Sequence, residues 1–213
     1  MTRTSGRIAR RSLTAGAVLA LTGCASLLGV SPPGHLYRLT AAGAYPANLP
    51  RVRAQLLIDL PQAPAGIDTS RIALSRSPLS LDYYADSEWT DRVTALVQTA
   101  LLASFENSGA ITAIDRESIG LRPDFVLETE IRHFEAVYDR NTAPPTAWVA
   151  IIARLVAMPR RRIAAQTAFE RRVPAAANNI PDAVAAINSA ADAVMREIVL
   201  WTLGDPALSA RHG

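Results

Sequence analysis

Hydrophobic residues recur along this chain with two periods, one typical of helices and one typical of strands. A helix is predicted from Trp89 to Gly109, where spacings of three and four place one stripe on one face. Its members are Val93, Leu96, Val97, Ala100, Leu101, Ser104 and Phe105. Asp86 or Ser87 is expected to cap its start, with Glu88 and Asp91 near the first turn, and Gly109 is expected to end it.

A second helix is predicted after Pro181, which suits the first helical position, and it ends at Gly204. Its apolar stripe consists of Val184, Ile187, Ala191, Val194, Ile198 and Trp201.

Alternating or continuous apolar runs predict the strands. They cover residues 35–39, 51–60, 71–75, 79–84, 111–114, 124–138, 147–157 and 163–172. In the segment 124–138 the inward parity changes near Arg132 and His133, which predicts a β-bulge. The last two strands are expected to form a hairpin around three solvated arginines, Arg160–Arg162.

The order of these elements is strands, helix, strands, helix, which predicts an α+β fold. We expect a single domain over residues 35–205, in which a mostly antiparallel sheet carries both helices on one face. Residues 206–213 are expected to form a disordered tail.

The N-terminal segment has the features of a secretory signal peptide. Arg3, Arg7, Arg10 and Arg11 precede an apolar run, residues 13–21, that is too short to span a bilayer. Leu-Thr-Gly-Cys, ending at Cys24, resembles the lipobox of bacterial lipoproteins, in which the cysteine receives diacylglycerol and the peptide is cut before it. Residues 1–23 are therefore predicted to be removed, Cys24 to be acylated, and residues 24–34 to form a tether. The alternative is an uncleaved signal anchor that happens to contain a cysteine.

Composition narrows the function further. Cys24 is the only cysteine in the chain, which excludes an intramolecular disulfide and a cysteine metal cluster. The whole chain has a net charge of +3, but four arginines lie in the signal segment, so the remainder is close to neutral. The sequence pI near 9.5 therefore gives no argument for nucleic acid binding.

Residues with catalytic chemistry do not form a recognisable site. The chain has no nucleotide-binding loop, nucleophile elbow or metalloprotease motif. His35, His133 and His212 lack neighbours at ligand or triad spacing, and Glu128 and Glu130 share one face of a strand, as on an exposed sheet. We predict no catalytic residue, metal ion or cofactor other than the acyl groups on Cys24.

Aromatic residues give the candidate binding surface. Tyr83, Tyr84 and Trp89 lie within seven positions at a junction between a strand and a helix. Adjacent strand residues point to opposite faces, so one tyrosine is expected at an interface, where aromatic side chains are enriched. The alternative is that these residues belong to the core, which the sequence favours for Trp89.

The order of short motifs along the chain resembles the ABC-type transport auxiliary lipoproteins, the family that includes the lipoprotein of the paraquat-inducible operon. The similarity extends from about Leu36 to Leu203. It rests on Tyr37-x-Leu39, Ile58–Pro61, Gly66-Ile67, Arg71–Ala73, Leu81–Tyr84, Trp89, Phe105–Gly109, Asp124–Leu127, Ile131–Ala136 and Trp201.

The resemblance implies a non-enzymatic periplasmic protein that works with an MCE-domain protein and, through it, with an inner-membrane ABC permease and ATPase in lipid or solute transport. Ala25, where lipoproteins of the inner membrane usually carry Asp, predicts anchoring in the outer membrane. Two alternatives stay open, a lipoprotein that assists an outer-membrane assembly machine and a lipoprotein enzyme acting on cell wall or lipid. The sequence also leaves a homo-oligomer open.

Overall fold

The computed structural model describes Thr2 and residues 34–111, 113–116, 122–139 and 144–209. The chain divides into two units, Met1–Pro32 and Pro33–Gly213. The predicted signal peptide, Cys24 and the tether lie outside the described residues, apart from Thr2 and Gly34. The second unit is a single domain that contains its own hydrophobic core.

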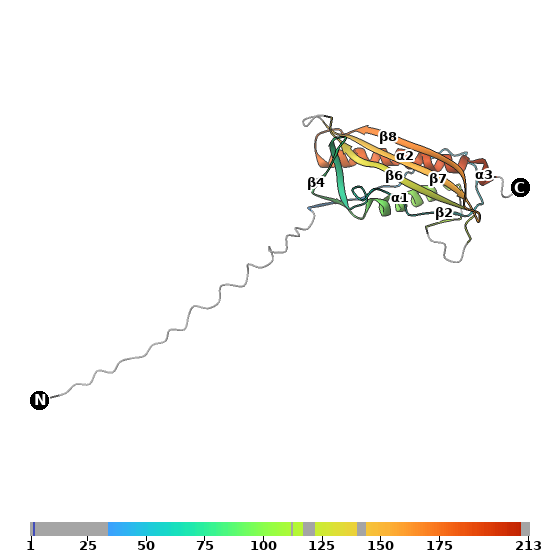
Figure 1. Ribbon diagram of the computed structural model, residues 1–213, viewed down its shortest axis with the longest axis horizontal. Coiled ribbons are helices and arrows are strands. Elements are labelled where there is room, and N and C mark those ends of the chain that lie inside the picture. The colour runs from blue at the N-terminus through green and yellow to red at the C-terminus, as the bar shows by residue number, and fades with distance from the viewer. Residues whose placement is uncertain (1, 3–33, 112, 117–121, 140–143, 210–213) are drawn as a thin grey trace. The chain divides into compact units, whose positions relative to one another are not determined.

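The domain is built on one sheet of eight strands (Figure 1). The strands are β1 (His35–Tyr37), β2 (Leu56–Ile58), β3 (Arg71–Ser77), β4 (Ser80–Trp89), β5 (Ile114–Asp115), β6 (Phe125–Val137), β7 (Thr146–Ala157) and β8 (Arg162–Pro174). Strand β4 lies between β1 and β3. Strand β6 pairs with both β3 and β2, and β2 also pairs with β5. Strand β7 lies between β6 and β8.

The sheet is mixed, so the prediction of a mostly antiparallel sheet is wrong. β6–β7, β7–β8 and β3–β4 are antiparallel, as expected of hairpins. The pairs β1–β4, β2–β5, β2–β6 and β3–β6 are parallel. β2 and β3 follow one another along the same edge of β6, and Gln62 between them bridges to Glu130. Both strands therefore run in the direction of β6.

The long strands confirm the predicted bulge. The register between β6 and β7 shifts between Ile131 and His133. Ile131 on one side of the shift and Phe134 on the other are both buried in the core. The extra residue thus keeps apolar side chains facing inward along the whole of β6.

Helix α1 (Val93–Ser108) begins later than predicted. Asp86 and Ser87 do not cap it, because β4 continues to Trp89, whose N–H donates to the carbonyl of Ser70 at 2.7 Å. The N-cap residue is Arg92, which makes no side-chain capping bond. Gly109 ends the helix in the left-handed conformation with φ 61°, as predicted.

Asp68, which lies outside α1 in the loop before β3, makes hydrogen bonds with residues at the start of the helix. Its carboxylate accepts hydrogen bonds from the guanidinium of Arg92 and, at 2.7 Å, from the hydroxyl of Thr94. Burial alone would raise the pKa of Asp68, but these hydrogen bonds and the charge of Arg92 outweigh it, so the pKa is lowered. The folded state therefore keeps this carboxylate ionised at neutral pH.

Helix α2 (Ile180–Gly204) follows a cap at Asn179, whose side-chain oxygen accepts the N–H of Asp182 at 2.9 Å. Pro181 occupies the first turn, as predicted. A short helix, α3 (Pro206–Ser209), then continues the domain. The prediction that residues 206–213 form a disordered tail is wrong for residues 206–209, because Leu208 is only 1% exposed in the core. Residues 210–213 lie outside the described part.

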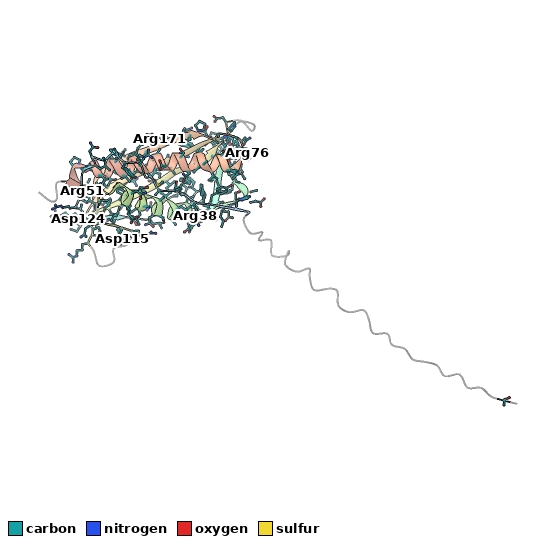
Figure 2. All side chains as sticks on the ribbon, turned by 180° about the vertical axis from the view of Figure 1, so that it is seen from behind. Arg38, Arg51, Arg76, Asp115, Asp124 and Arg171 are labelled. Atoms are coloured by element: carbon teal, nitrogen blue, oxygen red, sulfur yellow. The ribbon has the colours of Figure 1, made fainter. Side chains whose placement is uncertain are left out.

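Both long helices lie on the same face of the sheet. Strands β6–β8 lie in front of α2 in Figure 1, and α2 lies in front of them in Figure 2, which shows the domain from behind. α1 packs beside α2 and against β2 and β5. The largest fully buried side chains between the layers include Trp89, Phe105, Phe125 and Phe134. Among the described residues, no helix is both long and apolar enough to cross a membrane.

Candidate interaction surface

The structure separates the three aromatic residues of the predicted binding junction. Trp89 is 1% exposed, and its ring meets Phe134 edge to face at 5.8 Å between centroids. It lies at the end of β4 in the core between sheet and helices. Trp89 is therefore a packing residue, which corrects its inclusion among the partner-binding residues.

Tyr84 points toward the core and joins a polar chain at its edge. Its hydroxyl lies 2.9 Å from the hydroxyl of Tyr138, which donates in turn to the side-chain oxygen of Asn178 at 3.2 Å. Burial is the main cause that raises the pKa of Tyr84, and the hydrogen bond with Tyr138 raises it further. Tyr84 thus ties β4 to the end of β6 and to the loop before α2.

Tyr83 points to the opposite face, as the alternation of the strand predicts. Its hydroxyl donates to the carbonyl of Gly66 at 2.9 Å. The guanidinium of Arg71 lies 3.6 Å from the centre of its ring, a cation–π arrangement. Tyr83 is half-buried and held from both sides, so it presents a fixed aromatic surface on the sheet face away from the helices.

A second aromatic group on this outer face was not predicted from the sequence. The ring of Trp148 is stacked on His133, with centroids 3.3 Å apart and planes 11° from parallel. The guanidinium of Arg172 lies 3.9 Å from the Trp148 ring centre. Nδ1 of His133 lies 2.8 Å from Oε1 of Glu135, which fixes the imidazole against the indole.

Strand register places this group and Tyr83 in one row across the outer face. Trp148 is opposite Arg172 on β8 and opposite Glu135 on β6. Because Leu74 is paired with Ala136, the residue before it, Ala73, lies beside Glu135. Ala73 is paired with Tyr83. We call Tyr83, His133, Glu135, Trp148 and Arg172 the outer aromatic band.

A shallow hollow of about 490 Å³ lies beside the band. It is bounded by His133, Trp148 and Glu170 and has an apolar floor that includes Ala150, Ile152 and Ala168. The indole N–H of Trp148 is buried without a hydrogen-bond partner among the described residues. Apolar floor, aromatic rings and arginine in one patch match the composition of protein–protein interfaces.

Two features of the sequence point to Trp148 once the hairpin is known. It is the aromatic residue on the outward parity of the strand 147–157, whose inward residues are Ala147, Val149 and Ile151. His133 and Glu135 share the outward parity beyond the bulge. Only the pairing of β6 with β7 brings these residues together, and the spacing within one strand does not contain that information.

The sheet therefore carries the long helices on one face and the outer aromatic band on the other, where its aromatic and arginine side chains are of the kinds enriched at protein interfaces. The chain belongs to the family described as ABC-type transport auxiliary lipoprotein component, whose sequence profile matches residues 37–199. That description is of an auxiliary part of a transport system.

Solved structures share the fold of this chain. Protein XCC0632 from Xanthomonas campestris is similar with a TM-score of 0.74 and 29% identity, covering 79% of this chain and 94% of that protein. A second, uncharacterized protein has a TM-score of 0.62 and 11% identity, covering 79% of this chain and 97% of its own, and shows the fold alone. Among curated proteins, no significant sequence match is found.

Proposed function

We propose that this protein is a non-enzymatic, outer-membrane-anchored lipoprotein that serves an MCE-type transport system carrying lipid or an organic solute between membranes. Its partner is a periplasmic MCE-domain protein, which connects it to an inner-membrane ABC permease and ATPase. The observation that carries the proposal is the family match over residues 37–199. The anchor at Cys24 and the MCE partner go beyond that match and rest on the resemblance of the sequence.

The outer aromatic band is the surface we assign to the protein partner. Its side chains are held in place before binding, Tyr83 by Gly66 and Arg71 and Trp148 by His133 and Arg172. Fixed aromatic side chains lose little conformational entropy on binding, which favours affinity. In this role Tyr83 remains a partner-binding residue, and Tyr84 supports it from the core side.

Copurification from the bacterial envelope tests the transport role. We expect an MCE-domain protein to be recovered with the tagged full chain after mild cross-linking. The permease and ATPase should be recovered in the same preparation. Recovery of an outer-membrane barrel instead, with no MCE-domain protein, would favour a role in outer-membrane assembly and contradict the proposal.

Lipid anchoring is tested by Cys24→Ser. The wild-type protein is expected to incorporate labelled palmitate and to fractionate with the outer membrane. The variant is expected to lose the label completely and to remain as an uncleaved or soluble form, because no other cysteine is present to replace the acylated thiol. Labelling of the variant would contradict acylation at Cys24, and recovery of the wild type with inner-membrane markers would contradict the predicted address.

A further inference from the structure

The turn between β7 and β8 carries a concentrated positive charge at one end of the domain. Residues 158–161 connect the two strands, and Arg160, Arg161 and Arg162 are all exposed. The N–H of Met158 donates to the carbonyl of Asp124 at 2.8 Å. Figure 2 places Asp124 at the end of the domain opposite to Arg76. We call Met158–Ile163 the arginine turn.

Most of this charge is not neutralised by the described part of the chain. Arg161, with φ 48°, pairs with Glu128 at 2.7 Å. The carboxylate of Asp124 accepts the backbone N–H of Gln55 at 2.9 Å. The side chains of Arg160 and Arg162 have no ion-pair or hydrogen-bond partner within the described residues. Two guanidinium groups are therefore free to bind an anion.

The arginines surround an apolar base. A hollow of about 360 Å³ is lined by Ala157, Met158, Pro159, Arg160 and Arg162. Beside it, the side chain of Ile163 is 54% exposed, one of the large apolar side chains that the described surface leaves in solvent. Exposed apolar groups flanked by arginine at a projecting turn are suited to a bilayer interface, where guanidinium groups bind phosphate and apolar groups enter the headgroup layer.

We propose that the arginine turn binds the headgroups of anionic phospholipids at a membrane surface. This contact is separate from the N-terminal anchor, and it is independent of which protein occupies the outer aromatic band. The turn uses Arg160 and Arg162 for the phosphate groups and Met158, Pro159 and Ile163 for the apolar contact. An acidic protein partner could use the same arginines, but it would not make the chain float with anionic vesicles.

Vesicle flotation tests this proposal. The chain from residue 24 onward, with Cys24→Ser and without the signal segment, retains the whole domain and its core. We expect it to float with phosphatidylcholine vesicles that contain phosphatidylglycerol and not with pure phosphatidylcholine vesicles. Arg160→Gln with Arg162→Gln should weaken this binding about 25-fold, since each basic residue at an anionic surface contributes about a factor of five.

The matched control is Arg38→Gln with Arg76→Gln, which removes the same charge at exposed positions away from the turn (Figure 2). Circular dichroism checks that all variants are folded, and Ile163→Ser should weaken flotation without changing charge. Equal binding by wild type and the Arg160/Arg162 variant, no binding by wild type, or an equal loss in the control would overturn the proposal. Binding of inorganic phosphate to the turn, with no flotation of the wild-type chain, would reassign the turn to small anions and also overturn it.

Discussion

Replacing Trp89 with alanine is expected to lower the free energy of unfolding by about 3–5 kcal/mol. The indole is among the largest fully buried side chains and packs against Phe134 in the layer between sheet and helices. Its removal leaves a large cavity and takes away the edge-to-face contact of Phe134. The surrounding strands cannot move in to fill the cavity. Urea unfolding of the wild type and the variant measures the difference.

The matched control for this experiment is Trp148→Ala. Trp148 is half-buried on the outer face, and its removal exposes existing surface instead of creating a closed cavity. We expect it to cost less than half as much stability as Trp89→Ala. A Trp89 variant that is as stable as wild type but fails to bind the partner would contradict the assignment of Trp89 to the core.

The second large effect is on binding. Trp148→Ala is expected to weaken the affinity for the proposed MCE-domain partner about thirtyfold, which corresponds to the roughly 2 kcal/mol typical of an aromatic hot spot. Trp148 lies at the centre of the band between His133 and Arg172, so its removal also releases both neighbours from their fixed positions. Tyr83→Ala, in the same row of the sheet, should weaken the same interaction.

Trp201 supplies the control for that measurement. It is also half-buried, but it lies on α2 and meets Phe169 edge to face at 5.7 Å, away from the outer aromatic band. Trp201→Ala should reduce stability and leave the affinity within about twofold of wild type. An equal loss of affinity in the two tryptophan variants would show that binding depends on the fold as a whole and would contradict the assigned surface.

Local features of the fold were predictable from the sequence. The apolar stripe beginning at Val93 identified α1. Gly109 identified the end of the helix, because glycine has no Cβ and adopts the left-handed backbone conformation at little cost. The change of parity near His133 identified the bulge in β6. Each of these features depends on residues close together in the chain.

Features that depend on distant pairing were not predictable in the same way. Alternation shows which face of a strand is buried, but it is the same for parallel and antiparallel neighbours, so the direction of β2 and β3 beside β6 was missed. Serine is a common N-cap residue, so Ser87 was predicted to cap the helix. In the structure Ser87 belongs to β4, where it pairs with β1. The same limit hid Trp148, whose role arises from residues on β6 and β8.

In the proposed role, this protein is a binding component of an MCE-type transport system, and its open sheet face carries the binding. Titration of the purified chain with the purified periplasmic part of an MCE-domain protein from the same organism tests this most directly. We expect saturable binding by the wild type, about thirtyfold weaker binding by Trp148→Ala and unchanged binding by Trp201→Ala. Absence of binding by the folded wild-type chain, or binding that Trp148→Ala leaves unchanged, would contradict the claim.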